Sequence, residues 1–124
     1  MEFHVDSSAT MRRTFTRADL AEYASLTGAL LPEDARVLPG PFLGSLFSCL
    51  LGTQLPGRGT NYLKQHLEFP RSAFVEEELT ATVQIVRWRP EKQLVNLRTV
   101  CTNPAGEIVC HGEALVLVKD VQSG

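Results

Sequence analysis

The chain has 124 residues, enough for one domain with one hydrophobic core. Hydrophobic residues make up 44% and charged residues 21%, which is ordinary globular usage and excludes intrinsic disorder and fibrous repeats. The net charge of −2 and the scattered basic residues argue against nucleic-acid binding, and the sequence has neither a signal peptide nor a membrane-spanning run, so a cytoplasmic location is expected.

The first predicted elements are a tail, a short strand and a helix. Residues 1–10 are polar and are predicted to be a flexible N-terminal segment, and residues 11–16 are compatible with an edge strand. Thr16 is typical of a helix N-cap, and Asp19 three residues later completes a capping-box pattern. Gly28 is a natural stop, so the sequence predicts a helix between Thr16 and Gly28.

A second helix is predicted after an irregular, proline-rich segment. Pro41 can occupy the first turn of this helix, where its missing N–H costs nothing, and the apolar pattern continues to Gln54. Apolar side chains cover most of its surface, so we expect a buried helix whose remaining side packs closely against a sheet. The small residues on that side are Gly44, Ser45, Ser48 and Cys49.

From Thr60 onward the hydrophobic period changes to two, which predicts strands. The four runs cover approximately residues 62–69, 79–85, 95–101 and 108–118, and turns containing Pro or Gly separate them. The fold class is therefore α+β, with a single antiparallel sheet wrapped around one long buried helix, which is the hotdog architecture. Such a sheet has an edge strand that dimerisation usually covers.

The chain has an odd number of cysteines, Cys49, Cys101 and Cys110, and their spacing is not that of a zinc site. We therefore expect neither a disulfide scaffold nor a metal site. No cofactor is expected either. If the last hairpin turn is centred on Ala105-Gly106, Cys101 and Cys110 face each other across the two strands. In a reducing cytosol we expect free, buried thiols, although an internal pairing stays open.

The run SLFSCLLGTQLPGRGTNYLKQHLEF, residues 45–69, resembles the (R)-specific enoyl-CoA hydratases of the MaoC-like dehydratase family, in which a buried helix ends in an LG-x2-LPG-x-G turn. The upstream FTRADLAEYASLTG and the later FVEEELTATVQIV and GEALVLV also resemble that family, in the same order. The resemblance implies one MaoC-like hotdog domain over residues 11–124. It also implies binding of acyl thioesters of CoA or acyl carrier protein, in fatty acid or polyketide metabolism.

The same resemblance implies that the catalytic pair is replaced in this chain. Family members hydrate trans-2-enoyl thioesters, or dehydrate the 3-hydroxy form, with an Asp and a His that follow the TG at the end of the entry helix. Here the Asp position falls on Ala29 and the His position on Asp34. A His-Gly pair, whose neighbouring backbone N–H polarises the thioester carbonyl, becomes Pro39-Gly40. Weak or altered activity is therefore expected.

The candidates for replacing the lost acid and base are Asp34, Glu33 and His66. A buried carboxyl with a raised pKa can serve as an acid or a base, but PED is also typical of an exposed turn. His66 stands on the polar side of its strand, and the alternative there is an exposed or interface histidine.

Candidates for substrate binding are Gly40, Ser45 and Ser48. Gly40 would contribute its backbone N–H at the start of the buried helix, as the resemblance implies. The serine hydroxyls could contact the thioester or its pantetheine arm. They are more typical of small packing residues that bond back to a helix carbonyl.

Three functions stay open. The first is a hydro-lyase of the enoyl-thioester hydratase and dehydratase class with a rebuilt site. The second is a catalytically silent hotdog subunit that pairs with an active homologue, so that the protein would be a homodimer or a heterodimer. The third is a thioesterase-like hydrolase on the same fold. Ala29 and Pro39 favour the silent subunit, whereas Gly40 favours retained thioester binding.

Overall fold

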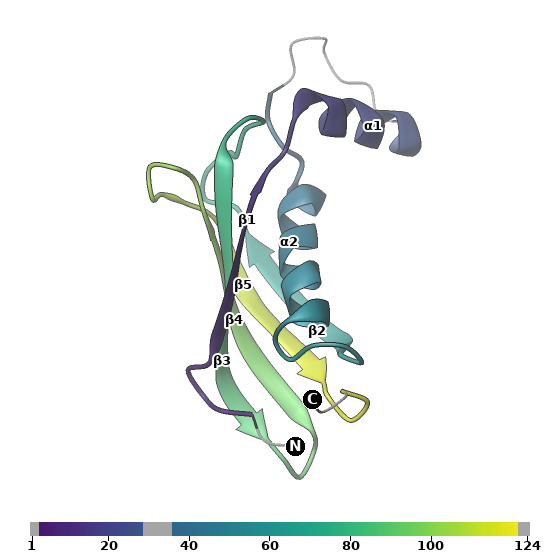
Figure 1. The fold of residues 1–124 in the computed structure, drawn as a ribbon, viewed down its shortest axis with the longest axis vertical. Coiled ribbons are helices and arrows are strands. Elements are labelled where there is room, and N and C mark those ends of the chain that lie inside the picture. The colour runs from purple at the N-terminus through teal and green to yellow at the C-terminus, as the bar shows by residue number, and fades with distance from the viewer. Residues whose placement is uncertain (1–2, 29–35, 122–124) are drawn as a thin grey trace.

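The computed structural model describes residues 3–28 and 36–121. Five antiparallel strands form one sheet in the order β1-β3-β4-β5-β2, and α2 lies along one face of it (Figure 1). The predicted α+β hotdog architecture is confirmed. In chain order the elements are β1 (Ser8–Thr14), α1 (Arg17–Thr27), α2 (Gly40–Thr53), β2 (Asn61–Glu68), β3 (Glu78–Arg89), β4 (Leu94–Thr102) and β5 (Ile108–Leu117).

The ends of α1 follow the local chemistry of the sequence. The Thr16 hydroxyl accepts a hydrogen bond from the Asp19 N–H at 3.1 Å, and the Thr16 N–H donates to the Asp19 carboxylate at 2.8 Å. Gly28 ends the helix with a left-handed φ of 73°. Both predicted ends are confirmed. Of the side chains of α1 only Leu20 is buried, and Leu26 is 80% exposed, because α1 extends beyond the end of the sheet (Figure 1).

The second helix lies where the sequence predicts it, starting one residue earlier and ending one residue earlier than the predicted bounds. Its apolar side is buried against the sheet, and the five buried side chains of this helix are each at most 2% exposed. Among the small residues Gly44 comes near the sheet, since a Cβ added there would lie 3.7 Å from the Leu67 side chain. Ser45, Ser48 and Cys49 are exposed, so the prediction that this side packs closely against the sheet is wrong, and the apolar side makes that contact instead. The buried residues of α2 are Leu43, Leu46, Phe47, Leu50 and Leu51.

The N-terminal segment is more ordered than the sequence predicts. Residues 8–10, which were predicted to belong to a flexible tail, form the first half of β1 and pair with β3. Ala9 packs against the core, and the ring of Phe3 meets the Trp88 ring edge-on at 5.1 Å. Pairing with a strand more than seventy positions away places residues 8–10 in the sheet.

Strand β2 carries an irregularity that changes the face of one side chain. The register with β5 shifts between Tyr62 and Lys64, so Leu63 is an extra, bulged residue. Strict alternation would place the Tyr62 side chain on the same face of the sheet as Lys64 and His66. The bulge instead turns Tyr62 to the face that carries Gln65, the face toward α2.

The last hairpin has the predicted register, because Cys101 of β4 lies opposite Cys110 of β5. Both are buried, and both are free thiols in the structure. None of the helices within the described residues is long and apolar enough to cross a membrane.

Candidate functional site

The amino end of α2 presents a backbone hydrogen-bond donor. Pro39 occupies the N-cap and makes no side-chain cap, and Pro41 has no N–H to offer. Within the described part of the chain the Gly40 N–H makes no hydrogen bond. N–H groups at a helix start carry partial positive charge, so this end can bind a carbonyl or an anionic oxygen.

Gly40 also lies close to Phe69, the residue that follows β2. A Cβ added to Gly40 would lie 3.0 Å from the Cζ atom of Phe69, which is closer than ordinary van der Waals contact. A side chain at this position would have to displace the ring. The glycine thus keeps the start of α2 tight against Phe69.

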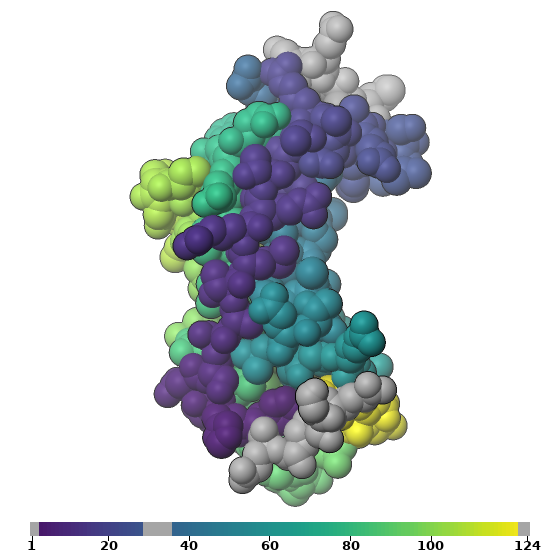
Figure 2. Space-filling model, in the orientation of Figure 1, coloured from purple at the N-terminus to yellow at the C-terminus, as the bar shows by residue number. Residues whose placement is uncertain are grey.

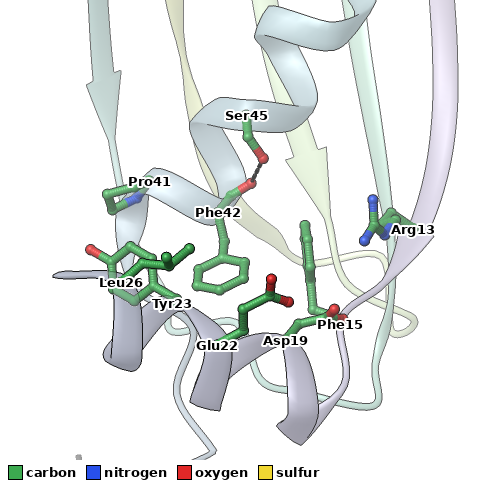
Figure 3. A pocket seen from close by; sticks show the side chains of 9 residues that line it. All are labelled: Arg13, Phe15, Asp19, Glu22, Tyr23, Leu26, Pro41, Phe42 and Ser45. Carbon is green, nitrogen blue, oxygen red and sulfur yellow. Dashed lines mark hydrogen bonds between the residues drawn. The ribbon is translucent and has the colours of Figure 1, made fainter. Parts of the chain in front are cut away.

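A cavity of about 310 Å³ lies next to this helix start, between α1, the end of β1 and the first turns of α2 (Figure 3). The surface is hollowed below α1 in the space-filling view (Figure 2). Most of the wall is apolar, with a few polar groups at its edge, which is the usual character of a small-molecule site. The lining residues are Arg13, Phe15, Asp19, Glu22, Tyr23, Leu26, Pro41, Phe42 and Ser45.

Three aromatic rings form the apolar wall. The Phe42 ring from α2 meets the Phe15 ring edge-on at 4.9 Å and the Tyr23 ring at 5.1 Å (Figure 3). The Arg13 guanidinium lies over the Phe15 ring, 4.7 Å from its centroid. Sequence reasoning missed this wall, because Phe15 precedes α1, Tyr23 belongs to α1 and Phe42 to α2, and only the tertiary fold brings the three together.

The polar groups of the cavity are partly engaged in local structure. The hydrogen bond from the Thr16 backbone N–H lowers the pKa of the Asp19 carboxyl, which stays ionised while it caps α1. The Ser45 hydroxyl donates to the Phe42 carbonyl at 2.6 Å. Ser45 therefore lines the cavity but bonds back to its own helix, as the packing alternative predicts.

Ser48 lies on another flank of α2, in a polar cluster with β2. The Tyr62 hydroxyl accepts a hydrogen bond from the Gln65 side-chain amide at 3.0 Å, and the nearby Ser48 hydroxyl acts with Gln65 to lower the pKa of Tyr62 against the larger effect of burial. Burial raises the pKa of Tyr62 to about 12, so the phenol stays protonated and can donate a hydrogen bond. Tyr62 could not be predicted at this position from the period-two pattern, because the bulge at Leu63 reverses its face.

His66 lies on the face of the sheet opposite α2. It pairs in register with Glu113, next to the Gln65–Ala114 pair that faces the helix. Its Nε2 lies 3.6 Å from Oε1 of Glu68, and the other oxygen of Glu68 lies 3.4 Å from Nε2 of His111. The sheet separates His66 from Gly40, so the structure does not bring these two predicted site residues together.

The other predicted acid and base candidates, Glu33 and Asp34, lie outside the described residues, as does Ala29. Their catalytic roles stay predictions. Within residues 3–28 and 36–121, no three His, Cys, Asp or Glu side chains gather as metal ligands would.

Comparison with known proteins identifies relatives of the whole chain, although no protein-family model matches it. The chain is 35% identical over 123 residues to an (R)-specific enoyl-CoA hydratase from Rhodospirillum rubrum, and the match covers 90% of this chain and 85% of the relative. The structure of the (R)-hydratase from Aeromonas caviae, involved in PHA biosynthesis, superposes with a TM-score of 0.84 at 33% identity, covering 93% of this chain and 96% of that one.

A more distant structure shares the fold alone. The ChsH1-ChsH2 complex from Mycobacterium tuberculosis superposes with a TM-score of 0.78 at 10% identity, covering 94% of this chain and 98% of that one. That neighbour is a complex of two different components.

Proposed function

The chain belongs to the MaoC-like family of hotdog proteins that includes the (R)-specific enoyl-CoA hydratases, and from that premise we propose that it binds acyl thioesters at the amino end of α2. The acyl carrier is CoA or an acyl carrier protein. The observation that carries the proposal is the Gly40 N–H, which lies without a partner in the described chain beside an apolar cavity. A thioester carbonyl that accepts from this N–H would be polarised by the helix start.

Within this function, we propose that hydration itself is weak or altered. The reaction adds a water oxygen to the β-carbon and a proton to the α-carbon, so it needs a base for the water and an acid for the carbon. Ala29 can do neither, and Asp34 can hold only one proton. Each missing proton-transfer partner costs about 10²- to 10⁴-fold in rate, so little turnover remains unless Asp34 or Glu33 substitutes.

The activity is tested by following the loss of enoyl absorbance when the protein meets a short trans-2-enoyl-CoA. We expect slow turnover by the natural chain and a gain of at least about 100-fold in the Ala29→Asp, Asp34→His double variant, because both proton-transfer groups return. Thermal unfolding of both proteins controls for folding. Turnover by the natural chain as fast as by the double variant would contradict weak activity, and Asp34→Asn and Glu33→Gln would then locate the replacement group.

Release of free CoA, measured with a thiol reagent, would instead favour the thioesterase-like alternative.

Thioester binding is tested separately, with a saturated acyl-CoA that cannot be hydrated. Gly40→Ala should weaken binding in calorimetry, because its methyl group would displace Phe69 and shift the helix start. Gly52→Ala is the matched control on the same helix, since a Cβ there meets nothing within 4 Å. Equal affinities for the two variants would contradict binding that depends on the tight start of α2.

A second candidate function is the silent subunit that pairs with an active homologue. The observation in its favour is the β2 edge, where every residue except Leu67 is exposed. An exposed edge strand presents unpaired N–H and C=O groups that a second hotdog sheet can bond. Size-exclusion chromatography of this chain mixed with a family member that retains the Asp and His tests it. A mixed dimer with higher activity than the active homologue alone would support it, and two unmixed species would contradict it.

A further inference from the structure

The β4–β5 hairpin holds two cysteines directly opposite each other near its turn. Cys101 and Cys110 are partners in the antiparallel register, and only the Thr102–Ile108 pair separates them from the turn. Both side chains have 0% exposure, and both thiols are free. The thioester site at the start of α2 makes no use of them, so their pairing has no role in the proposed function.

The geometry of this pair suits a covalent bridge. Directly opposed residues of an antiparallel pair have Cβ atoms about 4.5–5.5 Å apart, and a disulfide needs about 3.5–4.5 Å. A closure of about 1 Å therefore suffices, and the strands need not change register. The two thiols also interact electrostatically, because Cys101 contributes to raising the pKa of Cys110, after burial as the larger cause.

The position at the hairpin end offers a route for reagents. Pairing of β5 with β2 ends at His111, so Cys110 is held in the sheet by β4 alone. The ladder is already irregular beside the pair, with a register shift between Cys101 and Thr102. Local opening of this hairpin end breaks few hydrogen bonds, so it costs less than unfolding of the whole domain.

We propose that Cys101 and Cys110 form a reversible cross-strand disulfide in the presence of a low-molecular-weight disulfide such as oxidised glutathione. The thiolate of one cysteine attacks a glutathione sulfur and releases one glutathione thiolate. The second cysteine thiolate then attacks the protein-bound sulfur of the mixed disulfide and releases the other. The two protein thiols are oxidised, one glutathione disulfide is reduced to two thiols, and the protein loses two hydrogen atoms.

The bridge should stabilise the fold measurably. It closes a loop from residue 101 to residue 110 and so restricts the unfolded chain. We expect the melting temperature to rise by about 5–10 °C on oxidation, and reduction with dithiothreitol should reverse the rise.

The experiment uses the full chain with Cys49→Ser, because Cys49 is exposed on α2 and would form mixed disulfides of its own. The protein is incubated folded, and in parallel refolded from denaturant, in glutathione buffers of increasing oxidised fraction. After an acid quench the remaining free thiols are alkylated under denaturing conditions, and the intact mass is measured by mass spectrometry. We expect both thiols to be lost together, with a mass lower by two hydrogen atoms and no glutathione attached.

Cys101→Ala and Cys110→Ala in the same background are the matched controls, and each should keep one free thiol or carry one glutathione. Refolding removes the question of access, since both thiols are then exposed before the hairpin forms. A refolded protein with native circular dichroism that still has two alkylatable thiols, or carries glutathione on them, would overturn the proposal.

Discussion

At the scale of single residues, Thr99 is the one buried polar residue within the described ranges, and its hydroxyl has no hydrogen-bond partner there. A buried, unpaired hydroxyl costs about 1–3 kcal/mol of desolvation. Thr99→Val keeps the branched shape and removes the hydroxyl. We expect the free energy of unfolding to rise by about 1 kcal/mol, as measured by urea denaturation.

Thr82→Val is the matched control for this prediction. Thr82 lies on the outer face of the sheet, and its hydroxyl is 3.1 Å from the Thr10 hydroxyl. Its loss should leave stability unchanged or slightly lower, since a hydrogen bond disappears with the hydroxyl. An equal gain from both substitutions would trace the effect to the strand preference of valine and contradict the role of the unpaired hydroxyl.

At the scale of elements, the contact between β5 and β2 depends on Gly112. A Cβ added there would overlap the carbonyl group of His66, so Gly112→Ala must push β2 away. Overpacking of this kind costs about 1–3 kcal/mol, and we expect the upper end because the obstacle is backbone.

Gly52→Ala adds the same methyl group to a helical position with open space around it. It should stabilise the protein by about 0.5–1 kcal/mol through the better helix propensity of alanine. Chemical denaturation of both variants makes the comparison. An unchanged midpoint for Gly112→Ala would contradict the close approach of the two strands.

Elements whose ends depend on neighbouring residues could be predicted from the sequence. Thr16 and Asp19 cap α1 through bonds three residues apart, and Pro41 marks the first turn of α2, so local chemistry decides both. The bulge at Leu63 could not be predicted in this way. It exists because β2 must match β5, some fifty positions further along the chain, and a period of two carries no information about that partner.

The candidate site likewise contains residues that local sequence predicts and residues that only the tertiary fold brings to it. Gly40 could be predicted as a binding residue, because its place at the start of the buried helix and the family resemblance both depend on neighbouring residues in the sequence. The cavity does not, because Tyr23 and Leu26 reach it only through the placement of α1 over the start of α2. His66 lies on the polar side of its strand, as the period-two pattern predicts, but which face of the sheet meets α2 depends on the tertiary fold.

At the scale of the whole molecule, the sheet ends in two edges, β1 and β2, and we expect β2 to pair with a second subunit. Leu63 is 51% exposed on that edge. Leu63→Glu adds a charge and should shift the protein from dimer to monomer in size-exclusion chromatography with light scattering. Val5→Glu, at an equally exposed apolar residue before β1, should leave the dimer intact. A monomeric natural chain at the highest soluble concentration would contradict this interface.

The whole molecule should also lose stability in alkaline solution. Burial raises the pKa of Cys101 to about 11 from 9.0 and the pKa of Cys110 to about 12 from 9.0. Burial likewise raises the pKa of Tyr62 to about 12 from 10.0. Above pH 9 the unfolded chain therefore releases protons that the folded chain retains, so the free energy of unfolding falls as pH rises.

The stability linked to the two thiols is fully present below pH 9 and is lost as pH rises toward 11 and 12. Each fully buried thiol can lower the free energy of unfolding by up to about 1.4 kcal/mol per pH unit in its window. Urea denaturation at several pH values between 8 and 12 under reducing conditions measures the slope. The Cys101→Ala, Cys110→Ala double variant should start less stable, because it leaves small cavities, yet show a flatter decline above pH 9. Tyr62→Phe should flatten the decline only above pH 10. The same slope in the natural chain, the double cysteine variant and Tyr62→Phe would mean that folding does not raise the pKa of any of these groups.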